Sequence, residues 1–382
     1  MRVLYMHAPG NQIAGSEIVL MDIIKGLEPK CEHLVLVPEK EVFYHRLRSE
    51  GFNVRVLSLS GFNRHQPFLY IKEFWQVLKT IKKFKPDLIH TSSAAPVQYA
   101  YPISRLMHIP LVCHIQCPYG KDDLRRYFPY MADKIIAISD SVKAVFPNKY
   151  HPKITTVYNG INLPDYNRQR ERRYILNEYK LPEPSKIIGI VGQIIHRKGL
   201  DILLKSLPDV LKYESIVQLL VVGDTQTKFA REMKTLSVEL GVEDHVTWCG
   251  YQEEPQQLMA GMDILVVPSR SEGFGLVAAE ALATETPVIC SAVEGLTEIV
   301  TGDHNGYRVP VENVQHLSHK IKLLLHYPKM RAEFGRSGRQ KVKETFSKPR
   351  QSDQIANIYQ NLLVKKKTRK PWNQSTLNLS KV

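Results

Sequence analysis

Short, nearly continuous apolar runs alternate with segments of helical period along most of the chain. Such runs are typical of parallel strands covered on both faces, and their alternation with helices predicts an α/β fold with right-handed crossovers. The predicted strands cover residues 3–6, 33–37, 53–57, 87–90, 111–115, 134–138 and 154–158, then 187–191, 217–222, 246–249, 264–267 and 288–290.

The alternation lapses between about residues 163 and 185, a charged stretch with three prolines. We therefore predict two doubly wound domains that face each other across a ligand cleft at the carboxyl ends of their strands. The predicted boundaries are 1–165 for the first domain, 166–185 for a linker, 186–345 for the second domain, 346–364 for a C-terminal helix and 365–382 for a basic, disordered tail.

Composition narrows the class of protein. The chain has 382 residues, of which 43% are hydrophobic and five are cysteines, too few for a disulfide framework. The N-terminus lacks the charged start and long apolar run of a signal peptide, and no apolar stretch is long enough to span a bilayer. We expect a soluble cytoplasmic protein with reduced thiols.

The net charge of +14 is distributed unevenly. Residues 1–170 carry 23 basic and 14 acidic side chains, residues 171–360 carry 23 and 24, and residues 361–382 carry six basic and none acidic. This excess predicts an anionic partner for the first domain and the tail: a membrane surface, a nucleic acid or an anionic substrate.

The most informative motif is the segment 269–280, which follows a predicted strand and opens a predicted helix at 276–283. Its glycines, Gly273 and Gly275, let backbone N–H groups approach a ligand, and the helix N-terminus favours an anion such as phosphate. Glu272 and Glu280 lie up to roughly 12 Å apart, too far to flank one scissile bond as the carboxylates of a retaining hydrolase do. They suit two parts of one elongated ligand.

The pattern P-S-x-x-E-G-F-G-L-x-x-x-E-A at 268–281 resembles the retaining nucleotide-sugar glycosyltransferases of the GT-B fold, specifically glycosyltransferase family 4. The resemblance implies two Rossmann-like domains, an N-terminal one for the acceptor and a C-terminal one for the donor. It implies that Glu272 contacts donor-sugar hydroxyls and Glu280 the ribose, while sugar and phosphate lie on the backbone of Gly273, Phe274, Gly275, Leu276 and Val277.

One departure from the family follows directly. The family has glycine where this chain has Glu285, and that position resembles a helix end, so we expect a small cost in stability rather than in function.

A second motif, residues 191–199, resembles the family's G-R-x-x-x-x-K-G, whose Arg and Lys neutralise the donor diphosphate. Gly192 and Lys198 match it, whereas Gln193 replaces the Arg. We expect Lys198 and the adjacent Arg197 to supply the cationic charge and Gln193 a neutral hydrogen bond.

The first domain carries two further candidates. Residues 10–17 resemble the family's G-G-x-E loop, with Ala14 for the first glycine, which predicts diphosphate binding by Gly15 and Ser16; a plain helix cap is the alternative. His114, at the end of a predicted strand, matches a His that the family places near the sugar–phosphate bond, so a catalytic role is implied. A buried core His is the alternative.

The resemblance implies transfer with retention. No carboxylate is placed as a covalent nucleophile, so same-face attack is favoured, with the leaving diphosphate helping to deprotonate the acceptor and Lys198 stabilising its charge. No Asp-x-Asp stands in a metal-binding context, so we expect neither a metal nor another cofactor.

The expected partners are a nucleotide-sugar donor and a glycan or lipid-linked acceptor of cell-surface polysaccharide assembly, at the inner face of the membrane. The segment 70–85 could meet anionic lipid through a face bearing Ile71, Phe74, Trp75, Leu78 and Ile81; a routine crossover helix is the alternative. Another GT-B enzyme, such as a nucleotide-sugar epimerase, is the rival function. A nucleic-acid-binding protein is a distant third, because no recognition motif is present, and we expect no nucleic-acid partner.

Overall fold

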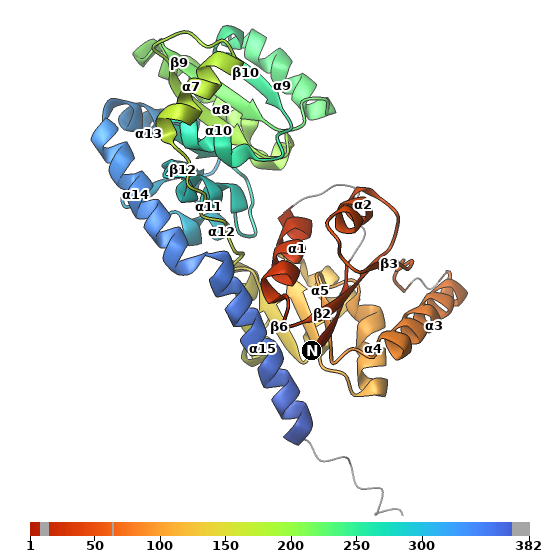
Figure 1. Cartoon of the computed structure of the whole chain (residues 1–382). Coiled ribbons are helices and arrows are strands. Elements are labelled where there is room, and N and C mark those ends of the chain that lie inside the picture. The colour runs from red at the N-terminus through yellow and green to blue at the C-terminus, as the bar shows by residue number, and fades with distance from the viewer. Residues whose placement is uncertain (8–14, 63–64, 369–382) are drawn as a thin grey trace, which may run out of the picture. The chain divides into compact units, whose positions relative to one another are not determined.

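The computed structural model describes residues 1–7, 15–62 and 65–368. The chain forms two compact units (Figure 1). Unit 1 comprises Met1–Ala137, Val145–Val157 and Gln351–Val382, and unit 2 comprises Ile138–Ala144 and Tyr158–Arg350. Two parallel-sheet α/β domains were predicted, and two are present.

Unit 1 is built on a seven-stranded, all-parallel sheet in the order β3-β2-β1-β4-β5-β6-β7. Its apolar strands are buried, as the continuous runs predicted. The strands are β1 (Arg2–Met6), β2 (Glu32–Val37), β3 (Val54–Val56), β4 (Leu88–Thr91), β5 (Leu111–Ile115), β6 (Lys134–Ala137) and β7 (Ile154–Thr156).

The helices of unit 1 connect and cover these strands. They are α1 (Gly15–Leu27), α2 (Val42–Ser49), α3 (Pro67–Phe84), α4 (Val97–Met107), α5 (Lys121–Tyr127) and the 3₁₀ turns η1 (Pro129–Met131) and η2 (Asn148–Lys153). The long α15 (Lys348–Thr368) joins them from the far end of the chain (Figure 1). It corresponds to the helix predicted at 346–364, and the tail beyond residue 368 lies outside the described residues.

Unit 2 has a six-stranded parallel sheet in the order β10-β9-β8-β11-β12-β13. Its strands are β8 (Lys186–Val191), β9 (Val217–Val222), β10 (Val246–Gly250), β11 (Ile264–Val267), β12 (Val288–Ser291) and β13 (Gly306–Val309). The last of these was not predicted. In each unit the strand order reverses beside the first strand, next to β1 in unit 1 and next to β8 in unit 2, and such switch points are where open α/β sheets bind ligands.

The helices of unit 2 connect these strands, and buried apolar residues within 200–210, 230–233, 317–325 and 334 share one apolar core with the sheet. These helices are α6 (Asp140–Ala144), α7 (Arg168–Glu178), α8 (Leu200–Tyr213), α9 (Lys228–Glu239), α10 (Pro255–Gly261), α11 (Leu276–Ala283), α12 (Glu294–Ile299), α13 (Val314–His326) and α14 (Pro328–Thr345), with η3 (His196–Lys198) and η4 (Glu243–His245).

The segment 166–185, expected as a linker, contains α7. Asn167 caps this helix, its side chain accepting a hydrogen bond from Arg170 N at 3.0 Å. The helix buries Ile175 and Leu176 and approaches α10 so closely that a Cβ on Gly261 would lie 2.9 Å from Arg172 N. The segment is therefore part of unit 2.

Candidate functional site

The motif loops of unit 2 follow β8 and β11, the neighbouring strands at the switch point. Their backbones are joined, because Arg270 N donates to Arg197 O at 2.8 Å and the Arg270 guanidinium donates to His196 O at 2.7 Å. Gly199, in the left-handed region at φ 74°, permits this approach, since a Cβ there would collide with Pro268 O. Two motifs far apart in the sequence thus form one site.

A carboxylate and two cations lie at the centre of this site. Lys198 Nζ donates to Glu272 Oε1, and Arg197 Nη1 lies 3.5 Å from Glu272 Oε2. Ser269 Oγ, which sequence reasoning did not single out, donates to Glu272 Oε1 at 3.1 Å. The Glu272 side chain is 9% exposed, that of Lys198 19% and that of Arg197 44%, so the cations are the more accessible partners.

A second ion pair, between Arg270 and Asp201, anchors the loop after β11 to helix α8. Arg270 grips Asp201, the second residue of α8, with two hydrogen bonds of 2.9 Å each. Burial opposes ionisation of Asp201, yet this bidentate pairing lowers the pKa of the Asp201 carboxyl below its usual value. The pair fixes the loop that carries Ser269 and Glu272.

The glycine loop leads into the predicted helix, because α11 spans Leu276–Ala283. Gly275 precedes it at φ 97°, a conformation that favours glycine. Phe274 is buried against Tyr158 and Phe346, with ring centroids 5.9 and 5.5 Å away, so only its backbone is available to a ligand. Gly273 and Gly275 lead into α11, which begins at Leu276 and Val277, and binding of a donor by the backbone of these residues stays a prediction.

Three more residues hold the glycine loop in place. Ser139 Oγ donates to Gly273 O at 2.7 Å, and Glu298 accepts from Asp140 N and Ser141 N at 2.9 Å each. A Cβ on Gly295 would lie 2.7 Å from Glu272 O, Gly273 C and Phe274 N. Gly295 and Glu298 thus help to position the glycine loop.

Glu280 lies further along α11 and outside the hydrogen-bond cluster of Glu272. Gln256 Nε2, on α10, donates to Glu280 Oε1 at 3.0 Å, a contact that no sequence motif indicated. The separation supports two recognition points on one ligand.

The helix end after α11 has the expected strained residue. Glu285 takes φ 61° in a Schellman-type turn, in which Thr286 N donates to Ala281 O at 2.9 Å and Glu285 N to Leu282 O at 3.1 Å. The position is one that glycine fills without strain.

The other predicted residues of the second motif lie beside Lys198. Gly192 has φ 133°, and a Cβ on Gly223 would collide with Gly192 O. Gly192, Gln193 and Lys198 line a small cavity backed by apolar residues of β8 and β9.

In unit 1, α1 begins at Gly15, and residues 10–14 of the predicted phosphate loop lie outside the described residues. Ser16 Oγ donates to Glu17 Oε2 at 2.8 Å. Glu17 in turn pairs with His7 Nε2 at 2.8 Å, and His7 Nδ1 lies 2.6 Å from Ser92 Oγ. This network ties the ends of β1 and β4 to α1, and phosphate binding by Gly15 and Ser16 stays a prediction.

His114 is the penultimate residue of β5, at the end of the strand where the sequence placed it. The imidazole has no exposed surface, its ring is 5.4 Å from that of His90, and burial lowers the His114 pKa to about 3. Its Nε2 has no hydrogen-bond partner among the described residues. The buried core position, kept above as the alternative, is what the structure shows, and contact with substrate stays a prediction.

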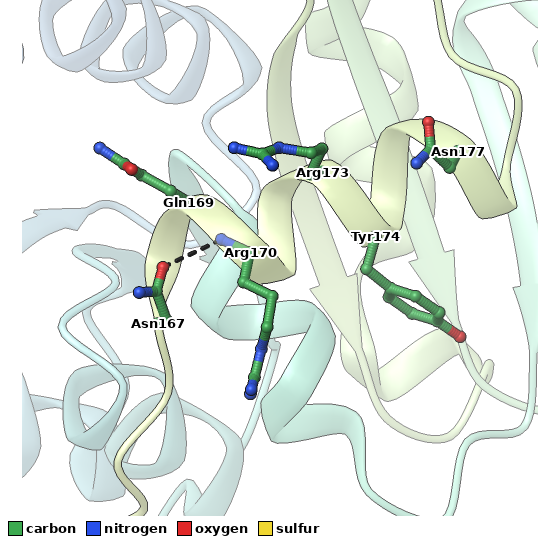
Figure 2. A pocket seen from close by; sticks show the side chains of 6 residues that line it. All are labelled: Asn167, Gln169, Arg170, Arg173, Tyr174 and Asn177. Atoms are coloured by element: carbon green, nitrogen blue, oxygen red, sulfur yellow. Dashed lines mark hydrogen bonds between the residues drawn. The ribbon is translucent and has the colours of Figure 1, made fainter.

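A recess away from these motifs lies along α7 (Figure 2). Its side chains all come from one helix and its cap, and in Figure 2 they splay outward instead of converging. It contains none of the predicted site residues.

Metal-site clusters and membrane-spanning helices are both absent from the described residues. Among residues 1–7, 15–62 and 65–368, no three His, Cys, Asp or Glu side chains gather as a metal site. Within the same residues, every helix is too short or too polar to cross a membrane.

Comparison with known proteins assigns both units. The sequence model described as Glycosyltransferase Family 4 matches residues 13–164, and the one described as Glycosyl transferases group 1 matches residues 171–341. An uncharacterized glycosyltransferase of Methanocaldococcus jannaschii is 27% identical over 79% of this chain and 85% of that protein. The capsular polysaccharide biosynthesis glycosyltransferase CapM of Staphylococcus aureus is 28% identical over 61% of this chain and 63% of its own length.

Solved structures share the fold at lower identity. Anabaena Alr3699/HepE in complex with UDP superposes with a TM-score of 0.82 at 21% identity, over 94% of this chain and 100% of that one. A glycosyltransferase from Rickettsia africae gives 0.84 at 20% identity, over 95% and 99%.

Proposed function

Because the chain belongs to the GT-B glycosyltransferases of family 4, we propose that it moves a sugar from a nucleotide-sugar donor to a glycan or lipid-linked acceptor with retention of anomeric configuration. The setting that we propose is cell-surface polysaccharide assembly, which the similarity to CapM supports. HepE has been solved in complex with UDP and with UDP-glucose, which supports the donor class.

The observation that carries the proposal is the contact of Lys198 and Arg197 with Glu272 across the two loops. A donor diphosphate would draw Lys198 and Arg197 away from Glu272 by charge-assisted hydrogen bonds. The freed carboxylate would then accept hydrogen bonds from sugar hydroxyls, so that no charge is left buried and unpaired. Ser269, bonded to Glu272, would keep the carboxylate aimed at the sugar.

In this mechanism the protein stabilises the charge that develops on the leaving diphosphate. Lys198, Arg197 and the backbone N–H groups at the start of α11 are preorganised for that charge. The acceptor attacks on the face from which the diphosphate departs, and a diphosphate oxygen takes its proton. Because these groups supply the positive charge, we propose that no divalent metal is needed; turnover lost with a chelator and regained with Mg²⁺ or Mn²⁺ would contradict this.

The test is a panel of UDP-, GDP- and ADP-sugars, measured by thermal shift and by donor hydrolysis. One donor class should stabilise the protein and be hydrolysed slowly, and retention is checked by the anomeric configuration of the transferred sugar. A donor isomerised with its diphosphate intact would favour the epimerase instead. No response to any nucleotide or nucleotide sugar would contradict the proposal.

Glu280→Ala refines this test. If Glu280 holds the ribose, its loss should weaken nucleotide binding about tenfold, because a hydrogen bond to a charged group contributes about 1.5 kcal/mol or more. Glu239→Ala, at the end of α9, is a matched control that should leave the affinity unchanged. Equal affinity of Glu280→Ala and the wild type would overturn the ribose assignment.

The acceptor is proposed to bind unit 1, which contains most of the segment 1–170 with its excess of basic side chains. An anionic or lipid-linked acceptor suits that charge. We propose accordingly that the enzyme works in peripheral contact with an anionic membrane at its cytoplasmic face.

A further inference from the structure

Helix α3 presents two unlike faces. Its inward face buries Val77, Leu78 and Ile81, which is the packing expected of a crossover helix. Trp75, predicted for the same apolar face, is instead 61% exposed. The reason is Glu73, which occupies an inward position by accepting hydrogen bonds from Ser58, Ser60 and Tyr99, and residue 75 lies about 200° around the helix from it.

The outward face of α3 forms a ridge of alternating aromatic and basic side chains. We define the α3 ridge as Phe68, Lys72, Trp75, Lys79 and Lys82, which recur at i, i+4, i+7, i+11 and i+14 and so share an arc of about 80°. Phe68 is 82% exposed, and Ile71 beside it is 49% exposed. The centre of an outward helix face is ordinarily polar, so two aromatic side chains there call for a partner.

The charge of the ridge has one sign. Glu73 is the sole acidic residue of α3, and it is buried at 1% exposure and hydrogen-bonded inward. The exposed ionisable groups of the helix are therefore all lysines, continued by Lys83 and by Lys85 at the C-cap. A partner that matches this surface is anionic and also offers an apolar layer.

The ridge is held rigidly on unit 1. Tyr70, on the inner side of α3, stacks on Tyr99 with ring centroids 4.8 Å apart and donates to Gln98 O at 2.8 Å. Phe62, 54% exposed, lies edge-on to Tyr70 at 5.5 Å. Figure 1 shows α3, in orange, as a straight helix next to α4 of the same unit. The exposed aromatics are thus presented by a fixed helix.

We infer that the α3 ridge docks unit 1 on an anionic lipid bilayer, with Phe68 and Trp75 at the acyl boundary and the lysines on lipid phosphates. Trp and Phe favour the bilayer interface, and each lysine gains from the negative surface potential. A nucleic acid would use the lysines but would give Phe68 and Ile71 no apolar layer. The inference deepens the proposed membrane contact and rests on it, while naming a surface that can be tested apart from catalysis.

The experiment is flotation of the full chain with vesicles of phosphatidylcholine, alone or mixed with phosphatidylglycerol. The wild type should bind only the mixed vesicles. Lys72→Glu/Lys79→Glu/Lys82→Glu should weaken binding about 100-fold or more, because each lysine contributes roughly a factor of five. Phe68→Ser/Trp75→Ser should weaken it at least about tenfold.

Matched controls come from unit 2. Tyr251→Ser/Val238→Ser removes two apolar side chains that are 70% and 60% exposed, and Lys228→Glu reverses a lysine that is 88% exposed. These variants should bind as the wild type does. A shift of tryptophan fluorescence to shorter wavelength on vesicle binding should vanish in Trp75→Phe, although that variant still binds.

Three outcomes would overturn the inference. Vesicle binding unchanged in the ridge variants, or abolished by removing residues 369–382 alone, would place the contact elsewhere. Binding to heparin or DNA that exceeds binding to mixed vesicles and ignores Phe68→Ser/Trp75→Ser would identify a polyanion as the partner. Donor hydrolysis is measured in parallel. Ridge variants that lose vesicle binding but hydrolyse the donor normally would show that membrane docking and transferase activity are independent. Vesicle binding by a protein that turns over no donor would refute only the transferase proposal.

Discussion

In unit 2 the loops after β8 and β11 gather Lys198, Arg197 and Glu272 at a partly exposed surface. In unit 1 the ends of β1 and β4, which occupy the same place in their sheet, gather His7, Glu17 and Ser92, whose polar atoms are buried. The topology is shared, but the ion pairs of unit 2 are partly exposed, whereas the network of unit 1 is buried. Under the proposed function, the switch point binds the ligand in unit 2 and holds the fold together in unit 1.

Unit 1 has further buried polar side chains next to the network of His7, Glu17 and Ser92. His90 Nδ1 lies 2.5 Å from the hydroxyl of Tyr359, a residue of α15, and the ring of His90 faces those of Tyr5 and His114. A charge removed from unit 2 should therefore alter turnover, whereas one removed from unit 1 should alter folding.

The largest expected effect is on catalysis in unit 2. Lys198→Ala should lower the turnover number about 10²- to 10³-fold, as loss of one preorganised donor to a developing charge does. Thermal unfolding should change little, because the partner Glu272 keeps Ser269 and Arg197. Steady-state kinetics and calorimetry measure both, with Lys228→Ala as the exposed control. Normal turnover in Lys198→Ala would contradict a catalytic role for the switch point of unit 2.

The reverse pattern is expected in unit 1. Glu17→Ala should destabilise the protein by about 3 kcal/mol, because it leaves the buried His7 without its 2.8 Å partner. Urea denaturation measures the loss, and Glu41→Ala, at the exposed start of α2, is the control. A Glu17→Ala protein as stable as the wild type, but inactive, would assign the network to the ligand instead.

The two units should lose stability at different pH values. Burial lowers the pKa of His114 to about 3 and that of His90 well below its usual value, so both are neutral when folded. Below about pH 6.5 the unfolded chain binds protons that the folded chain does not, and each His then removes up to about 1.4 kcal/mol of stability per pH unit. The lowered pKa of Asp201 affects unit 2 only below about pH 4.

Hydrogen exchange, corrected for the intrinsic effect of pH, should therefore show β4 and β5 losing protection between pH 7 and pH 5 while β8 and β11 keep theirs. Earlier loss in unit 2 would contradict the assignment of the acid-labile groups.

The smallest effect expected is a gain. Glu285→Gly should stabilise unit 2 by about 1 kcal/mol, because glycine takes φ 61° without strain. The ion pair that it removes, with Arg339 Nε 3.9 Å away, is half-exposed and contributes little. Glu285→Ala removes the same pair and keeps the strain, so it should give no comparable gain in melting temperature. Donor turnover should stay at the wild-type level in both.

Sequence patterning predicted the strands wherever apolar residues were contiguous. Residues 111–115, 217–222 and 264–267 are strands with the predicted bounds. β13 was missed because Gly306 and Arg308 interrupt its short apolar pattern. Helix α7 was taken for a linker because its buried apolar residues are Ile175 and Leu176 alone, and charged side chains dominate the rest, including the buried Glu171.

The site was predictable in its residues but not in its contacts. Local motifs identified Glu272 and Lys198, yet 74 residues separate them, and no spacing rule brings them together without the order of β8 and β11 in the sheet. Gln256 and Ser269 act by single hydrogen bonds, for which the sequence has no periodic signal. Trp75 was grouped on one face with Leu78 and Ile81, yet Trp75 is exposed and the other two are buried, because the inward position of Glu73 has no signal in the apolar pattern.

Unit 1 is discontinuous in the chain, since residues from Gln351 onward return to it after unit 2. During synthesis, β1 and β4 emerge long before Tyr359, so His90 must wait for its hydroxyl partner until all of unit 2 has been made. The N-terminal sheet would pass that interval without α15, whose Ile355 and Tyr359 are fully buried in the finished unit. Unit 1 should thus be completed only after unit 2 has been synthesised.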